Sequence, residues 1–380
     1  MSLRPSRRGL VPPFIAMDVL RAANAREAAG ERVIHLEVGQ PGTPAPAAVL
    51  DAARAALGGE KIGYTDAEGI APLRAAIAGH YRAQYGLAVD PAEIAVTTGS
   101  SAAFQLAFLA AFEPGDRVAL AVPGYPAYRN ILSALGLETV LIEAGENAHY
   151  QPNPELLDRE DGLAGLIVAS PANPTGTMIA PAELERLYHY CRERGIRLVS
   201  DEIYHGITYG TAAQSARAFG QDAIVVNSFS KYYSMTGWRL GWMLAPPDLA
   251  RSVECLAQNF YISPPALSQL AAVAAFDCRE ELDGHVARYR ANRDLLTAAF
   301  AKAGLTRLAP AEGAFYLYVD VSSRTGDSGE LCRRMLAEIG VAATPGADFD
   351  PIHGNSWVRF SFAGSTGDIE EAARRLAGWL

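Results

Sequence analysis

The stretch SFSKYYSMTGWRLGW, residues 228 to 242, contains Lys231, one of three lysines in a chain of 380 residues that also holds thirty arginines. Arginine cannot replace a lysine that must form an imine, because the guanidinium stays protonated. A composition this poor in lysine indicates that amine chemistry is needed at position 231. Alone, Lys231 would more often be a solvated loop residue or a phosphate ligand, but its flanking residues favour the chemical interpretation.

Seven short apolar runs alternate with amphipathic helical stretches between about residues 46 and 275. They are EIAVTTG, DRVALAVP, LETVLIEA, LAGLIVAS, IRLVSDEIY, AIVVNSFS and GWMLAP. Several are apolar at consecutive positions, as strands covered on both faces must be, so the predicted fold class is α/β, with a mostly parallel sheet sandwiched by helices. Ligands gather at the carboxyl ends of such strands. Gly99, Ser100, Asn173, Asp201 and the Ser228 to Lys231 segment all end such runs, which indicates one site.

The sequence pattern of the C-terminal part predicts a smaller α+β domain. A long helical pattern covers residues 281–303 and ends before Gly304, with Lys302 in its last turn as a structural cation. Strand-like GAFYLYVDV and WVRFSFA then alternate with two further helical patterns. We therefore expect an N-terminal segment (1–45) that contributes to the small domain, a large ligand-binding domain (46–280) and a C-terminal small domain (281–380), with a cleft between the two lobes.

Charge and cysteine usage exclude several classes of function. A formal charge of −9 and a pI near 5.4 argue against a nucleic-acid surface. No run approaches the ~18 apolar residues of a membrane span, and the N-terminus is no signal peptide, so we expect a cytoplasmic protein. The histidines show no metal-ligand spacing, and no metal is expected. The cysteines, which form no CxxC pair and suit reduced core thiols, are Cys191, Cys255, Cys278 and Cys332.

The lysine window is similar to the SxSKxxxxxGxRxG signature of the class I and II aminotransferases, the aspartate-aminotransferase-like family of fold type I. The resemblance extends from GQP at residue 39 to VRFSF at residue 358. It implies pyridoxal 5′-phosphate as cofactor, with the imine on Lys231 and the phosphate bound by Arg239, Ser228 and Ser230. Once substrate displaces it, the freed amine would move a proton between the substrate α-carbon and the cofactor C4′ carbon.

Two further segments match the family beside the cofactor ring. Asp201 in VSDEIYHG resembles the DExY segment, whose aspartate pairs with the protonated ring nitrogen. Tyr204 would then donate to the phenolic oxygen of the cofactor. Asn173 in SPANPTG resembles the xxNPTG turn and would donate to the same oxygen and reach toward substrate. Taken singly, an acid after a strand is more often a helix cap, and NP is only a turn signal.

A phosphate cradle is expected at the start of the helix in TTGSSAAFQLAF. By resemblance Ser100, Ser101 and Ala102 hold the phosphate there, and backbone N–H groups at a helix start suit an anion. On this segment alone, an ordinary helix N-cap by either serine has roughly the same weight as the phosphate cradle. In PGYPAY, Tyr125 matches the aromatic residue that stacks on the cofactor ring, while Tyr128 is interpreted as packing.

The substrate and the partner subunit are also assigned by resemblance. Arg359 in WVRFSFA matches the arginine that grips the substrate α-carboxylate, and Gly39 in EVGQP would let the backbone approach that carboxylate. Tyr64 in KIGYTDAEG matches a tyrosine that reaches the phosphate of the other subunit, which implies a homodimer. No motif identifies a second arginine for a side-chain carboxylate. Tyr232 and Tyr233 replace the small or threonine residues often found there.

The resulting hypothesis is an aminotransferase that exchanges an amino group between an L-amino acid and a 2-oxo acid in a ping-pong reaction. A carbon–sulfur β-lyase or a related enzyme on the same fold is the nearest alternative. The sensor domain of a transcriptional regulator ranks lower, because only about forty residues precede GQP. A nicotinamide dehydrogenase ranks lower still, because no GxGxxG follows the first strand.

Overall fold

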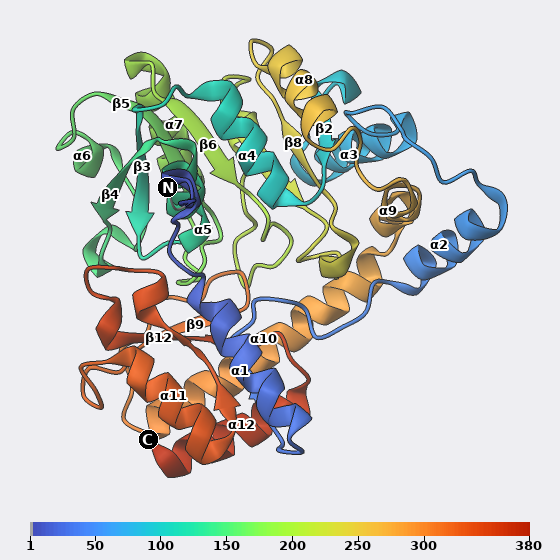
Figure 1. Ribbon diagram of the computed structural model, residues 1–380. Helices are drawn as coiled ribbons and strands as arrows, with labels where there is room; N and C mark the ends of the chain where they lie inside the picture. The colour runs from blue at the N-terminus through green and yellow to red at the C-terminus, as the bar shows by residue number, and fades with distance from the viewer. Residues whose placement is uncertain (1–2) are drawn as a thin grey trace.

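The structure is a computed structural model that describes residues 3–380. It has two lobes, with the long helix α10 (Arg279–Lys302) running through the smaller lobe and toward the larger one (Figure 1). The helix predicted over residues 281–303 is thus present and begins two residues earlier. Gly304, which follows it, has a φ of 78°.

A seven-stranded sheet forms the centre of the large lobe, and each of the seven apolar runs contributes one strand. The strand order is β2-β8-β7-β6-β5-β3-β4. Neighbours from β7 to β4 pair in parallel, and only β8 runs antiparallel to both of its neighbours. The predicted mostly parallel α/β sheet is confirmed. The strands are β2 (Ile94–Thr97), β3 (Arg117–Val122), β4 (Glu138–Glu143), β5 (Leu163–Ala169), β6 (Arg197–Asp201), β7 (Ile224–Ser228) and β8 (Gly241–Leu244).

Helices cover both faces of this sheet, as the consecutive apolar residues in its strands require. In β5, Leu166 and Val168 belong to one hydrophobic cluster and Ile167, between them, belongs to another. The first cluster packs under α2, α3, α7 and α9, and the second under α4, α5 and α8. These helices, with the single-turn α6, are α2 (Ala47–Gly59), α3 (Ala71–Tyr85), α4 (Ser100–Ala111), α5 (Pro126–Leu135), α6 (Pro154–Leu157), α7 (Pro181–Arg194), α8 (Ala250–Phe260) and α9 (Ala266–Ala272).

The small lobe combines short sheets with four helices. Strand β12 (Trp357–Ser361) lies between β11 (Thr344–Pro345) and β9 (Tyr316–Asp320) in an antiparallel sheet, and β1 (Ile34–His35) pairs in parallel with β10 (Val341–Ala342). Helix α12 (Thr366–Trp379) packs against α10, α11 (Ser328–Ile339) packs against α12, β10 and β11, and α1 (Ile15–Ala28) lies against the same lobe (Figure 1). Short 3₁₀ segments are Arg7–Gly9, Pro91–Glu93, Glu146–Ala148, Ala216–Ala218, Thr236–Trp238, Val273–Asp277, Gly346–Asp348 and Gly354–Ser356.

The N-terminal segment crosses from one lobe to the other. The 3₁₀ segment Arg7–Gly9 contacts α5 of the large lobe, whereas α1 contacts β10 and β11 of the small lobe. The carboxylate of Asp348 accepts hydrogen bonds from the N–H groups of Ile15 and Ala16 at 3.2 and 3.1 Å, which caps α1 from a residue far along the chain. These contacts support domain boundaries near residues 45 and 280, which remain a proposal. No helix within residues 3–380 is long and apolar enough to cross a membrane.

Candidate active site

A cavity of about 500 Å³ between the lobes brings together most of the predicted site residues. It opens at the carboxyl ends of β5, β6 and β7, where the parallel strands end at the same edge of the sheet. The small lobe closes it with residues of β9, β12 and α1. The predicted residues that line it are Gly39, Ser100, Ser101, Tyr125, Asn173, Asp201, Tyr204, Ser230, Lys231, Arg239 and Arg359.

Lys231 follows β7 and extends its amine into this cavity. Its Nζ donates to the carbonyl oxygen of Gly39 at 2.5 Å and lies 5.7 Å from the centre of the Tyr204 ring. Burial lowers the pKa of Lys231 to about 8, and the positive charges of Arg359 and Arg239 act in the same direction. The lowered pKa increases the fraction of neutral amine near physiological pH. A neutral lysine amine can act as nucleophile and as base.

Asp201, the last residue of β6, presents a buried carboxylate to the cavity. Oδ1 accepts from the Ile203 N–H at 3.1 Å, and Oδ2 accepts from the hydroxyl of Tyr128. Burial raises the pKa of Asp201 to about 6, although both hydrogen bonds and Lys231 favour its charged form. A cationic ring nitrogen would supply the counter-charge that this carboxylate lacks. Tyr128 packs, as predicted, with its ring against Tyr125, but its hydroxyl has the further role of holding Asp201, which the sequence did not indicate.

The start of α4 forms an anion-binding corner. Gly99 precedes the helix with φ 84°, and no side chain caps it. Within the described chain, the N–H groups of Ser100 and Ser101 donate to no protein acceptor, as expected for the first residues of an uncapped helix. A Cβ at residue 99 would lie 2.5 Å from Nη2 of Arg239, so glycine admits the guanidinium beside these donors. Ser230 lines the same corner, and the set fits a phosphate dianion.

Arg359 on β12 is a buried cation that has no carboxylate partner within residues 3–380. Its Nη1 donates to Oδ1 of Asn173 at 2.9 Å, and its Nη2 donates to the Glu37 carbonyl and to Oγ1 of Thr344. The side chain is 2% exposed, and its Nε has no partner. Buried charges are normally paired. The guanidinium therefore has both a free donor and an unmet charge for a carboxylate ligand.

Tyr204 and Tyr316 join the two lobes inside the cavity. Their hydroxyl oxygens are 2.6 Å apart, and both side chains are buried. Sequence reasoning assigned no role to Tyr316, because the run GAFYLYVDV predicts only a strand. Three apolar residues at the start of α1 that line the cavity were also missed, since this segment carries no motif: Met17 and Leu20 in the helix and Phe14 directly before it.

Three predicted residues do not line the cavity. Ala102 is buried within α4. Ser228 lies behind Ser230, with its hydroxyl 2.9 Å from that of Ser230. Tyr64, in the loop between α2 and α3, is 82% exposed. Their proposed contacts with the cofactor stay predictions.

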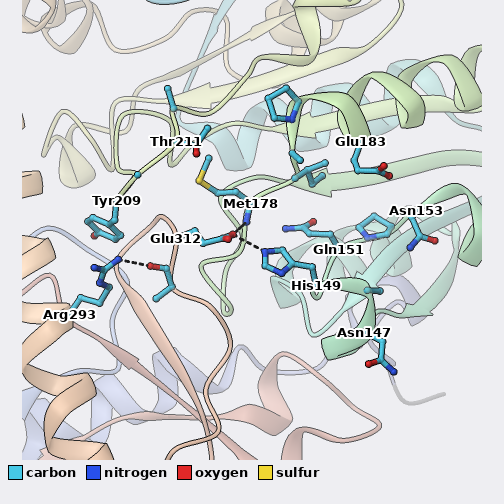
Figure 2. Close-up of a pocket in the computed structure, with 18 residues that line it drawn as sticks. Asn147, His149, Gln151, Asn153, Met178, Glu183, Tyr209, Thr211, Arg293 and Glu312 are labelled. Carbon is cyan, nitrogen blue, oxygen red and sulfur yellow. Dashed lines mark hydrogen bonds and ion pairs between the residues drawn. The ribbon is translucent and has the colours of Figure 1, made fainter.

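A larger cavity of about 740 Å³ lies elsewhere between the lobes (Figure 2). Its prominent polar groups are already paired: Glu312 accepts from His149 and from the Met178 N–H at 2.8 and 2.9 Å, and Arg293 donates to the Ala311 carbonyl at 3.0 Å. None of the predicted site residues lines it. We therefore assign the active site to the smaller cavity around Lys231. Within residues 3–380 no cluster of three or more His, Cys, Asp or Glu side chains is placed to hold a metal ion.

The site combines a reactive amine, a buried acid, an anion-binding helix start and a buried arginine without a carboxylate partner among the described residues. On this two-lobed fold, these features define a class of enzymes that process amino acids through a bound aldehyde. Comparison with known proteins identifies the family. The family model for aminotransferase class I and II matches residues 31–376, so the chain belongs to that family.

Individual relatives agree with this assignment. The chain is 52% identical to the valine–pyruvate aminotransferase of Mycobacterium tuberculosis, over 100% of this chain and 99% of the relative. A crystal structure of an aminotransferase from M. tuberculosis, 52% identical, superposes with a TM-score of 0.98 over 100% of this chain and 99% of that one. The aspartate aminotransferase of Thermus thermophilus, solved with maleate, is 32% identical and has a TM-score of 0.93, with both chains fully covered.

The predicted family, enzyme class and reaction are thereby confirmed. The chain is an aminotransferase that exchanges an amino group between an L-amino acid and a 2-oxo acid. These relatives favour this activity over the carbon–sulfur lyase alternative. The family depends on pyridoxal 5′-phosphate.

Proposed function

We propose that this aminotransferase holds pyridoxal 5′-phosphate on Lys231 and acts on amino acids and 2-oxo acids with small apolar side chains. The observation that carries the proposal is the cavity itself, in which Lys231 and Arg359 share one space with an apolar wall. When bound, the cofactor supplies an electron sink for the substrate α-carbon. The residues around it bind, orient and move protons.

The cofactor-binding residues divide by the part of the cofactor that they face. Asp201 would keep a proton on the ring nitrogen, and Tyr128 and the Ile203 N–H already hold its carboxylate in place. Tyr204 and Asn173 would bind the phenolic oxygen. Tyr125 would stack on the ring. The phosphate takes the α4 corner, with Ser100, Ser101, Ala102, Ser228, Ser230 and Arg239 as its proposed ligands.

The reacting substrate is placed between Lys231 and Arg359. Arg359 holds the α-carboxylate through the donors that its protein partners leave free. Gly39 lets the backbone approach the same group. Once substrate has displaced it from the cofactor, the Lys231 amine would carry the proton from the substrate α-carbon to the cofactor C4′ carbon, and in the other half of the exchange it would carry a proton back. Its lowered pKa favours this role near neutral pH.

The side-chain end of the cavity has an apolar wall. Met17 and Leu20 come from α1, Phe14 directly precedes that helix, and Ile131 comes from α5. Beyond the lysine and the two arginines already assigned, no other cation of the described chain lines the cavity, so a side-chain carboxylate would be buried without a partner. The wall therefore favours small aliphatic substrates. The M. tuberculosis relative is named for valine and pyruvate, and we propose the same pair here.

A homodimer with Tyr64 contributed across the interface completes the proposal. Exposed apolar side chains gather around the α2–α3 loop and the end of α8, and the Thr65 N–H donates to Oγ of Ser263 at 3.2 Å, which joins the two segments. The exposed residues are Leu57, Ile62, Tyr64, Phe260 and Ile262. Such a patch suits a second copy of the chain. The cytoplasmic location stays a prediction.

Spectroscopy and half-reactions test the proposal. Protein reconstituted with pyridoxal 5′-phosphate should show a band at the edge of the visible range, and valine or alanine should shift it far more efficiently than aspartate. Borohydride reduction and peptide mapping should place the cofactor on Lys231. The cofactor fixed at Lys61 or Lys302 would contradict the amine assignment, and a preference for aspartate would contradict the substrate class. Release of pyruvate and ammonia from cystathionine would instead indicate a lyase.

A further inference from the structure

Tyr316 lies where three groups of the active site meet. Its hydroxyl is 2.6 Å from that of Tyr204, and its ring centre is 4.5 Å from the guanidinium carbon of Arg359. A Cβ on Gly39 would lie 1.8 Å from the Tyr316 hydroxyl oxygen and 2.8 Å from Cζ. Because residue 39 is glycine, the hydroxyl of Tyr316 can lie against its backbone. The carbonyl oxygen of the same residue accepts the hydrogen bond from Lys231 Nζ. Any larger residue at position 39 would displace this tyrosine.

The hydroxyl pair has a defined direction once the cofactor is considered. Each phenol has a single proton to donate, so one of the two hydroxyls must act as acceptor in their hydrogen bond. Tyr316 has no other hydrogen-bond partner among the described residues, whereas Tyr204 is proposed to donate to the phenolic oxygen of the cofactor. The proton of Tyr204 is free for that oxygen only if Tyr316 donates to Tyr204. A hydroxyl that accepts one hydrogen bond is also a stronger donor in the next.

The ring of Tyr316 acts on a different group. The guanidinium carbon of Arg359 lies 4.5 Å from the centre of this ring and 4.6 Å from the centre of the Phe349 ring. Both distances are typical of cation–π contacts, which are strongest where water is excluded. The two rings hold the charge of Arg359 in a buried position where no carboxylate does so. Its Nε, which has no protein partner among the described residues, stays available for a ligand.

We propose that Tyr316 is a positioning residue with two separable functions: its hydroxyl directs the proton of Tyr204 to the cofactor, and its ring, with Phe349, orients Arg359 for the substrate carboxylate. The inference rests on the proposed function of the same site. It assigns a role to a residue outside every motif found in the sequence. The two functions can be separated because the hydroxyl and the ring can be removed one at a time.

Tyr316→Phe removes only the hydroxyl. In a spectroscopic pH titration of the reconstituted enzyme, loss of one hydrogen bond to Tyr204 should raise the proton affinity of the lysine-bound cofactor about fivefold. The kcat should fall, while the KM for valine changes less than about twofold. A titration curve identical to that of the wild type would overturn the hydroxyl function.

Tyr316→Leu removes the ring as well and tests the second function without the cofactor. Calorimetry with 3-methyl-2-oxobutanoate, the 2-oxo acid of valine, on cofactor-free protein should show binding about tenfold weaker than in Tyr316→Phe, because Arg359 loses one of its two rings. Equal affinity in the two variants would overturn the ring function. A thermal melt checks that each variant is folded, and Phe349→Leu, which removes the opposite ring, gives an independent variant should Tyr316→Leu not fold.

Tyr318→Phe is the matched control. Tyr318 is on the same strand two residues further along, is equally buried, stacks on Trp357 at 4.8 Å and lies outside the cavity. Neither the titration nor the calorimetry should change in this variant. A wild-type protein without the cofactor band would overturn the proposed function and the hydroxyl function together. A normal wild-type band with an unchanged titration in Tyr316→Phe would overturn only the role of Tyr316.

Discussion

The imidazole of His35 lies between two carboxylates of the small lobe and should control part of the pH dependence of folding stability. Nδ1 is 2.7 Å from Oε1 of the fully buried Glu37, and Nε2 is 3.3 Å from Oε1 of Glu27 on α1. The hydrogen bond to Glu37, together with the negative charge of both carboxylates, raises the pKa of His35 from 6.5 to about 9. The charged imidazole can donate to both carboxylates and so joins α1 to β1, whereas the neutral imidazole can donate to only one of them.

The size of the effect follows from this pKa change. A difference between 6.5 unfolded and about 9 folded corresponds to roughly 3 kcal/mol of stability. The imidazole is 30% exposed and Glu27 is 47% exposed, so solvent screening reduces this to about 1 to 2 kcal/mol. Because the folded pKa is the higher one, the stabilisation is complete below pH 6.5 and is lost as the pH rises through about 9.

Urea unfolding of the wild type and of His35→Gln, at about pH 6 and about pH 9.5, measures this contribution. Glutamine keeps a donor for Glu37 but cannot titrate. The wild type should be more stable than the variant by about 1 to 2 kcal/mol at the lower pH, and this advantage should disappear at the higher one. His353→Gln is the control, since His353 pairs with Glu143 at the surface. An advantage of His35 that persists at both pH values would refute the reasoning.

Three further predictions concern the active site. Lys231→Ala should abolish transamination without lowering the melting temperature, measured by half-reaction spectra and circular dichroism; full activity in this variant would refute the assignment. Tyr128→Phe removes a donor to the buried Asp201, so the pKa of that carboxyl should rise above about 6. In a fluorescence titration, the cofactor should then bind about tenfold more weakly than to the wild type. Unchanged affinity would show that the hydroxyl does not act on Asp201. Met17→Arg adds a cation to the apolar wall. The ratio of kcat/KM for aspartate to kcat/KM for valine should therefore rise at least about tenfold. A constant ratio would show that the substrate side chain lies elsewhere.

The sheet and half of the site could be predicted from sequence because their signals are local. Consecutive apolar residues such as Leu166 to Val168 in β5 require cover on both faces, and the two hydrophobic clusters provide it. Parallel strands end at one edge, so residues that follow different strands must meet there. This rule brings Asn173, Asp201 and Lys231 into one cavity although they lie far apart in the chain.

The antiparallel direction of β8 was not predicted, although the sequence holds a signal for it. Residues 229–240 connect β7 to β8 and contain no α-helix within the structure, only the 3₁₀ segment Thr236–Trp238. A parallel crossover needs a connection of a dozen or more residues, usually helical. The run GWMLAP gives strand content but no direction, and the lack of an α-helix in this connection, not its length, is what favours an antiparallel return.

The missed residues depend on how the lobes meet, which no local pattern encodes. The alternation in β9 indicates that Tyr316 points to one face, but not that Tyr204 lies opposite. Met17 is exposed along much of its side chain and lies in a helix with weak amphipathic character. The cap that Asp348 gives to Ile15 and Ala16 holds that helix over the cavity, together with the contacts of α1 with β10 and β11.

The division of labour between the lobes explains why sequence reasoning identified the reaction but not the substrate. The residues proposed for the cofactor come mostly from loops of the large lobe that follow strands, where motifs are short and contiguous. The residues proposed for the substrate come from the small lobe and α1, and they act through contacts such as Arg359 with Asn173 that cross between lobes. A substrate carboxylate on Arg359 would therefore bind to a group that already connects the lobes. Changes of specificity should accordingly be sought in α1 and in the residues that hold it, because there a side chain can change without disturbing Lys231 or Asp201.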